Sequence, residues 1–183
     1  MFSDFDEFYI PAICSGLNSF NVNIAIHTVN GFEVMSLEKK QPLSVPDLKL
    51  PHVFHIARRL QNQIPLGMFR LDTQEFICCY EESAVYINLH GDISRSVIME
   101  YVGKANSATL KLGCLLLFHE NFVEIRDVQN GRLKQIIEGK DISCLEDGDR
   151  DRWQTVKMVM RHPKNGQLQL VLELVPELVN KRD

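Results

Sequence analysis

The sequence predicts an all-β chain whose short strands form the blades of a β-propeller. Three observations predict this fold class: apolar residues recur at alternate positions, short polar turns separate these segments, and the strand–turn–strand unit repeats along the chain. The composition allows a packed core, because 45% of the 183 residues are hydrophobic and 24% are charged.

The first hairpin unit runs from residues 24–27 through Asn30-Gly31 into residues 32–34. Apolar residues two apart lie on one face of a strand, and Asn-Gly readily supplies the positive φ angles of a tight turn. Two further units have the same layout, with strands expected at residues 76–80 and 84–87 and at residues 114–118 and 122–125. The repeated unit therefore predicts successive sheets of similar build.

The spacing of the units is close to the length of a blade. Phe32, Val85 and Val123 hold equivalent places, at offsets of 53 and 38 residues, and four-stranded blades repeat every ~40–50 residues. The longer interval predicts an insertion, with prolines breaking regular structure between Gln41 and His52 and a short helix after them. The residues behind this prediction are Pro42, Pro46 and Pro51, then Val53, Ile56, Ala57 and Leu60 at helical spacing, and Pro65, which ends the pattern.

The last hairpin is predicted near the C-terminus. Val156, Met158 and Met160 alternate with other residues, Pro163 to Gly166 intervene, and leucines then recur at alternate positions from 168 to 174. Short strands with one small helix also fit a β-sandwich, but the blade-length repeat favours a propeller. We therefore expect about four blades.

Charge, apolar runs and cysteine content limit the functional classes. The net charge is −4 and no basic cluster is larger than a pair of adjacent residues, which argues against a nucleic-acid partner. No apolar run approaches the ~18 residues of a membrane-spanning helix, and the acidic N-terminus lacks the layout of a signal peptide. The five cysteines are odd in number and are best explained as small buried hydrophobes in a reducing compartment. We therefore expect a cytoplasmic protein.

Several fragments resemble catalytic or metal sites but fail on spacing. Asp147-x-Asp149-x-Asp151 begins like a calcium loop, yet the required Gly and Glu are replaced by Arg152 and Met158. The other candidates for a metal or catalytic site lack the further ligands or catalytic partners that such a site needs. They are His52 with His55, the adjacent Cys78-Cys79, and four histidines expected at surface turns, His27, His90, His119 and His162. We therefore expect no catalytic residue, no cofactor and no metal.

The most specific stretch of the sequence lies between Phe76 and Leu145. It contains Phe76-Ile-Cys-Cys-Tyr80-Glu-Glu, then Val85-Tyr-Ile-Asn-Leu-His-Gly91, and later the phrase from Phe122 to Gly131. These motifs, with Glu7-Phe-Tyr-Ile-Pro11 and Gly31-Phe-Glu-Val34, resemble the citron-homology (CNH) domain family. The resemblance covers nearly the whole chain. It is closest to the CNH domains of fungal Rho-type guanine-nucleotide exchange factors of the cell-wall-integrity pathway.

The resemblance implies a regulatory and scaffolding module that binds proteins and supports Rho GTPase signalling. Its partners would be Rho-pathway components or other domains of the parent exchange factor, with membrane association at the plasma-membrane periphery only through that parent. Exchange activity would reside in a Dbl-homology domain absent from these residues, so the chain is expected not to be an enzyme. The same resemblance leaves open a Ste20-type kinase or a vacuolar tethering protein as the parent. A small independent β-sandwich enzyme is the other alternative.

Most residues of these motifs are expected to be structural. Phe76, Cys78 and Tyr80 would fill one face of a blade, with Val85 and Ile87 opposite. Turn geometry would come from Gly91, Gly131 and Gly166. Glu124 and Arg126 alternate with apolar residues, which suggests a strand with one wetter face and a cross-strand ion pair.

From the length of the chain, we expect residues 1–183 to be the C-terminal portion of a single CNH propeller. A closed propeller of this family needs roughly 300 residues, whereas this chain supplies about four blades. The missing N-terminal blades are therefore an expected partner, without which the chain should be poorly soluble.

Three residues are the candidates for protein interaction. Trp153 is the only tryptophan and lies in a charged segment, and Arg58 and Arg59 lie on the predicted helix. The loops expected to carry specificity are Leu43–Pro51 and Ser143–Trp153, together with this helix.

Overall fold

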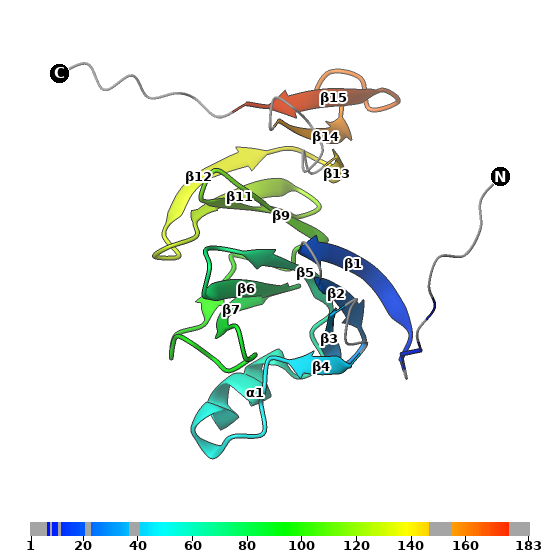
Figure 1. The fold of residues 1–183 in the computed structure, drawn as a ribbon. Coiled ribbons are helices and arrows are strands. Elements are labelled where there is room, and N and C mark those ends of the chain that lie inside the picture. The colour runs from blue at the N-terminus through cyan, green and yellow to red at the C-terminus, as the bar shows by residue number, and fades with distance from the viewer. Residues whose placement is uncertain are drawn as a thin grey trace. The chain divides into compact units, whose positions relative to one another are not determined.

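A computed structural model of the chain describes residues 7, 9–10, 12–20, 23–36, 41–146 and 155–175. The chain divides into two compact units, Met1–Glu100 and Tyr101–Asp183. Each unit contains two antiparallel sheets whose strands follow one another in sequence order (Figure 1). Consecutive antiparallel strands need only short turns, which is why this sequence is rich in local hairpins.

The first sheet contains four strands in the order β1-β2-β3-β4. Their bounds are β1 Cys14–Phe20, β2 Asn23–Thr28, β3 Gly31–Ser36 and β4 Pro42–Val45. The turn between β2 and β3 consists of Val29 and Asn30, and Gly31 adopts φ 123°, which a residue with a Cβ rarely adopts. The predicted first hairpin is confirmed.

The second sheet has the order β5-β6-β7-β8. Its strands are β5 Pro65–Arg70, β6 Glu75–Tyr80, β7 Ser83–Asn88 and the short β8 Met99–Glu100. The insertion between the two sheets forms the 3₁₀ helix η1 Pro51–Val53 and the helix α1 Phe54–Leu60. Along the chain, α1 follows the last strand of the first sheet and precedes the first strand of the second; it is the cyan helix in Figure 1.

One core cluster joins the two sheets and the helix of the first unit. Val85 and Ile87 of β7 lie directly opposite Cys78 and Phe76 of β6; Cys78, Val85 and Ile87 belong to this cluster, and Phe76 packs against it. Val53 and Leu60 at the two ends of the helix, and Ile56 between them, are buried in the same core as the sheets. The members of the cluster are Ala25, Phe32, Val45, Val53, Ile56, Leu60, Met68, Cys78, Tyr80, Val85 and Ile87.

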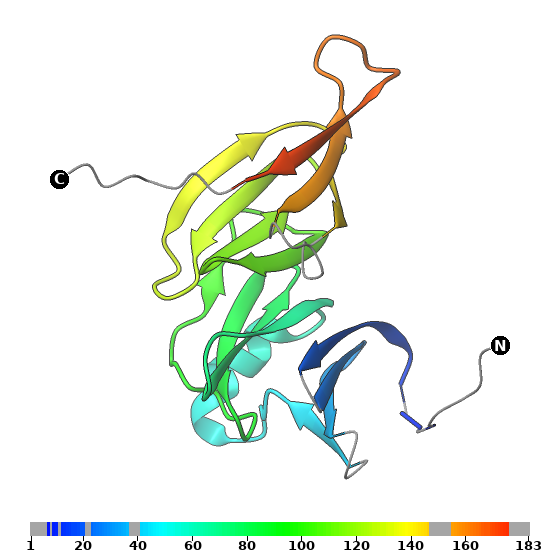
Figure 2. The ribbon, with the colours of Figure 1, turned by 45° about the horizontal axis from the view of Figure 1, so that its top comes forward.

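The second unit repeats the plan with one strand fewer. Its first sheet has the order β12-β11-β10-β9, and its second has the order β13-β14-β15. Figure 2 shows β14 and β15 in orange and red, joined by a loop. The strands are β9 Ser107–Lys111, β10 Cys114–Phe118, β11 Phe122–Asp127, β12 Leu133–Glu138, β13 Ser143–Glu146, β14 Val156–Arg161 and β15 Gln169–Leu174.

A second core cluster packs these two sheets together. Phe118 and Val123 come from the first sheet of the unit, and Met158 and Met160 come from the second. The outer strand β12 is mostly exposed, whereas β10 is mostly buried, as expected for a peripheral and a more central strand of one blade. All four sheets are therefore blade-like meanders, and the predicted all-β propeller class is confirmed.

Three local predictions were wrong. Residues 42–45 and 143–146 form strands rather than loops, because β4 and β13 are edge strands in the described sheets and an edge strand tolerates proline at its first residue. The turn before β15 is also longer than the tight turn expected. It spans residues 162–168, closed by the His162 amide donating to the Leu168 carbonyl at 2.9 Å, and Gly166 has no positive φ.

In the described part of the chain, no helix has the length and apolar character that crossing a membrane requires.

Candidate functional site

A depression of about 450 Å³ lies beside α1 in the first unit. It is lined by the β2–β3 turn, by the helix and the residues after it, and by the end of β6. Helix α1 directs Ile56 and Leu60 into the core, so Phe54 and Arg58 remain on its exposed side. The lining residues are Val29, Asn30, Gly31, Leu48, Phe54, Ala57, Arg58, Leu60, Gln61, Asn62, Gln63 and Tyr80.

Tyr80 contributes a hydroxyl group to this depression. The residue is 3% exposed, and its ring packs edge-on against Phe32 with centroids 5.5 Å apart. The structure gives the hydroxyl no hydrogen-bond partner among the described residues. It lies near Gly31, where an added Cβ would be 3.7 Å from the oxygen. Burial, followed by the neighbouring Cys78 and Cys79, raises the pKa of Tyr80 well above its usual value, so the hydroxyl remains a hydrogen-bond donor.

Gln63 holds the segment after α1 in place. Its Nε2 donates to the Arg59 carbonyl at 2.7 Å, and its Oε1 accepts from the Glu82 amide at 3.0 Å and from the Ser83 hydroxyl at 3.2 Å. One side chain thus ties the end of the helix to the β6–β7 turn. The wall of the depression is fixed by both elements.

The three predicted interaction residues fall in different places. Arg58 lines the depression, and the structure gives its side chain no partner among the described residues. Arg59 lies next to it in sequence but forms an exposed ion pair with Glu100 at 2.7 Å. Trp153 lies outside the described residues, as does the aspartate triplet of residues 147–151.

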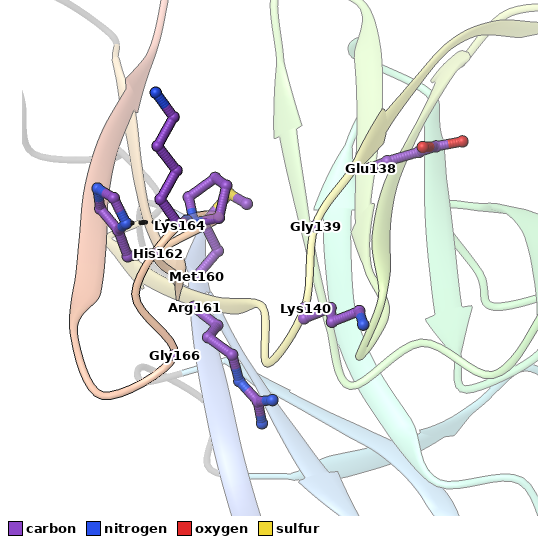
Figure 3. A pocket seen from close by; sticks show the side chains of 9 residues that line it. Glu138, Gly139, Lys140, Met160, Arg161, His162, Lys164 and Gly166 are labelled. Carbon is purple, nitrogen blue, oxygen red and sulfur yellow. Dashed lines mark hydrogen bonds between the residues drawn. The ribbon is translucent and has the colours of Figure 1, made fainter.

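A second depression, of about 470 Å³, lies in the second unit between the end of β12 and the β14–β15 loop. Lys140, Arg161, His162 and Lys164 line it, but Figure 3 shows the side chains of Lys140, Arg161 and Lys164 extending in different directions. Arg161 is also paired, because its Nη2 lies 2.5 Å from Asp141 Oδ2. These cations therefore do not converge on one point.

A buried ionic cluster surrounds Glu124 in the same unit. The Glu124 side chain is 0% exposed and pairs with Arg126 on its own strand, so the expected wet face and cross-strand pair were wrong. It also accepts from the Val102 amide at 3.0 Å and from His119 Nε2 at 3.1 Å. Burial favours the neutral acid, but the hydrogen bonds from His119, Val102 and Arg126 outweigh it and lower the pKa of Glu124.

Two histidines expected at the surface are buried. His119 is 2% exposed and stacks on Phe122 with ring centroids 4.1 Å apart. His27 is 7% exposed, and burial lowers its pKa to about 4. The neutral His27 ring donates from Nε2 to Asn18 Oδ1 at 2.7 Å. In each ring Nε2 has a polar side-chain partner, Glu124 for His119 and Asn18 for His27, which alternation alone did not reveal; Nδ1 of His119 is buried without a partner among the described residues.

The Asn18 oxygen also accepts from the Met68 amide at 2.9 Å. Met68 belongs to β5, whereas Asn18 and His27 belong to β1 and β2, so one side-chain oxygen links the first two sheets. This polar link was missed by sequence reasoning. No local pattern around Asn18 signals it, because its second partner lies 50 residues away.

The cysteines fit the expectation of buried hydrophobes only in part. Cys78 and Cys79 are buried, and burial, followed by the neighbouring Cys79, raises the pKa of Cys78 well above its usual value. A thiol in that state is a poor nucleophile. Cys14, at the start of β1, is exposed, so the expectation was wrong there.

Comparison with known proteins assigns the family. The model of the CNH domain matches residues 1–148. Rho1 guanine nucleotide exchange factor 3 of Schizosaccharomyces pombe is 31% identical over 179 residues, which cover 94% of this chain and 14% of that protein. Rho1 guanine nucleotide exchange factor 1 of the same organism is 29% identical over 143 residues, covering 78% of this chain and 11% of that protein. The chain thus spans only a small part of these curated relatives.

Solved structures agree with this assignment. The AfRom2 CNH domain matches with a TM-score of 0.77 and 27% identity, over 93% of this chain and 53% of that one. Sqt1 of Saccharomyces cerevisiae, at 10% identity and a TM-score of 0.57 over 91% of this chain and 47% of that one, shares the fold alone. The chain belongs to the CNH-domain family, and its four sheets are blades of a CNH β-propeller.

Proposed function

We propose that the chain is a non-catalytic regulatory and scaffolding module of a Rho guanine-nucleotide exchange factor. One observation carries this proposal: the chain aligns over 94% of its length with a fungal Rho1 exchange factor, of which it represents 14%. A segment of that size acts through the domains around it. The module binds proteins, namely components of the Rho pathway or other domains of its parent, and so positions or restrains the exchange domain.

The mechanism is the rigid display of loops. Each unit has a continuous apolar core that joins two blades, so the turns at the blade ends are held by packed strands. Loops fixed in this way can recognise a partner without losing much conformational entropy on binding. The parent protein would bring this surface from the cytoplasm to the periphery of the plasma membrane.

Residues 1–183 represent the C-terminal part of one CNH propeller in this proposal. The alignment with 53% of the AfRom2 CNH domain supports it, as does the three-stranded sheet β13–β15, since the other described sheets have four strands. The remaining blades come from sequence outside these residues. Co-expression with those blades should give a soluble, cooperatively melting complex, whereas a monodisperse monomer that melts cooperatively alone would contradict the proposal.

A domain exchange tests the function. In the Schizosaccharomyces pombe relative, the segment aligned with this chain is replaced by residues 1–183, and the level of Rho1-GTP is measured in cells. Deletion of the segment should change that level, and the chimera should restore it. Equal levels in the intact protein and in the deletion would contradict a regulatory role.

A purified exchange assay separates regulation from catalysis. The chain alone should leave the rate of fluorescent GDP release from Rho1 unchanged. A concentration-dependent acceleration by the chain alone would overturn the non-catalytic assignment.

A further inference from the structure

We propose that the depression beside α1 binds a short peptide segment of a partner protein that carries a bulky apolar side chain close to a carboxylate. This inference rests on the proposed function, because it names a recognition site within the protein-binding module. Three separate features of the depression support it: an apolar rim, an uncompensated cation and a hydroxyl group that makes no hydrogen bond to the described residues.

The apolar rim consists of side chains that would be costly to leave in water. Phe54 is 64% exposed and Val29 is 71% exposed, and both line a concave site of about 450 Å³. They come from different elements, the helix and the β2–β3 turn, so they face one depression from two sides. Concave sites of this size with apolar walls are typical of ligand-binding pockets. A bulky apolar side chain of a partner fits between them.

Arg58 specifies the charge of the occupant. Among the described lining residues it alone is charged, and it lies one helical turn after Phe54 on the exposed side of α1. Arg59, by contrast, is already paired with Glu100. An arginine guanidinium binds a carboxylate with two parallel hydrogen bonds. Residues one turn apart are about 6 Å from each other, so the carboxylate of the segment must lie near its apolar anchor.

Tyr80 supplies a directional contact at the inner side of the depression. Its side chain is nearly fully buried, and its hydroxyl makes no hydrogen bond to the described residues. The hydroxyl is therefore free to donate a hydrogen bond to a ligand carbonyl in the depression. The peptide backbone offers such an acceptor at every residue. This feature favours a peptide over a purely apolar ligand.

The site is preformed. Ile56 and Leu60 anchor α1 in the core, and Gln63 ties the residues after the helix to the β6–β7 turn. Binding therefore requires little ordering of the chain. The second depression lacks these properties, because its cations diverge and Arg161 is already paired with Asp141.

The test selects peptides from a random display library on the chain purified in its complex with the remaining blades. Enriched peptides are made with a fluorescent label, and binding is measured by anisotropy. The enriched sequences should share an aromatic or large aliphatic residue within a few positions of Asp or Glu. Replacing that acid by its amide should weaken binding about tenfold. Absence of enrichment over a Phe54→Ala/Arg58→Glu double variant would overturn the proposal.

Single substitutions locate the binding site. Phe54→Ala and Arg58→Glu should each weaken binding about tenfold or more, and a peptide with Lys in place of its acid should regain affinity for Arg58→Glu. Tyr80→Phe removes one atom and should weaken binding about threefold to tenfold. Arg132→Glu, at an exposed arginine in the second unit, should have no effect.

Melting temperatures of all variants identify any loss of folding. If peptides bind but are insensitive to Phe54→Ala, Arg58→Glu and Tyr80→Phe, the site lies elsewhere and the inference is wrong. If no peptide binds while the chimeric exchange factor still restores Rho1-GTP, this inference fails and the proposed regulatory function stands.

Discussion

The burial of neutral His27 predicts that the fold loses stability in mild acid. Its pKa is about 4 in the folded chain, against 6.5 for an unperturbed histidine. The unfolded state therefore binds a proton on this side chain at pH values where the folded state does not. Stability is fully present above about pH 6.5 and is lost as the pH falls toward 4, because protonation then favours unfolding. His27 faces Asn18 and Phe32, neither of which carries a charge.

The pKa difference sets the size of the loss. It corresponds to about 3 kcal/mol once both states are protonated, of which about 2 kcal/mol is lost by pH 5. Titration of Glu124 does not contribute to the loss of stability expected between pH 7 and pH 5. Its pKa is lowered in the folded state, so its contribution is present above the usual glutamate value and is lost only at more acidic pH.

Urea unfolding of the co-expressed complex at about pH 7 and about pH 5 measures the effect, with His27→Gln as the comparison. Glutamine can still donate to Asn18 but does not titrate. The variant will be less stable at both pH values, because it loses the edge-on contact with Phe32, whose centroid lies 5.1 Å from that of His27. The decisive quantity is the difference between the two pH values, which should be about 2 kcal/mol smaller in the variant. The other histidines are common to both proteins and cancel.

An equal pH dependence in the two proteins would refute this reasoning. A direct NMR titration of the His27 ring gives an independent check, since its midpoint should lie near 4.

Two further predictions concern a buried charge and a turn glycine, both measured by urea unfolding. Glu124→Gln should lower the free energy of unfolding by about 3 kcal/mol, because it leaves Arg126 without its carboxylate. The control Glu138→Gln, at an exposed position, should lower it by less than about 0.5 kcal/mol. Similar losses in the two variants would contradict the role assigned to the buried ion pair. Gly91→Ala places a Cβ 2.4 Å from a methyl of Val45 at φ 86° and should cost about 3 kcal/mol. Gly113→Ala, at φ 72° with no atom within 4 Å, should cost about 1 kcal/mol, so equal costs would rule out the clash.

The hairpins were predictable because their determinants are local. Alternation on both sides of a short turn placed β6, β7 and β10 to within one residue and β11 to within two. Pro42 was misread for a reason that is not local. A proline breaks a strand only where its missing amide is needed for pairing, and the sequence did not reveal that β4 pairs with β3 alone.

Buried polar side chains were the main failure of sequence reasoning. His119 and Glu124 look like surface residues of a turn and a strand, yet both are buried, and His119 Nε2 pairs with Glu124, which also accepts from the Val102 amide. The candidate site shows the same limit. The helix and Arg58 were signalled by sequence, but Val29 and Tyr80 reach the depression only because β2, β3 and β6 pack on one core.

The shared oxygen of Asn18 has a consequence for how the first unit assembles. Because neighbouring residues of a strand point to opposite faces, a slip of β1 by one residue would turn Asn18 away and leave two donors, on His27 and Met68, buried without an acceptor. Misaligned pairing of the first strand is therefore penalised at the junction with the next blade. The docked arrangement of the two blades is therefore favoured only when the first strand pairs in its native register.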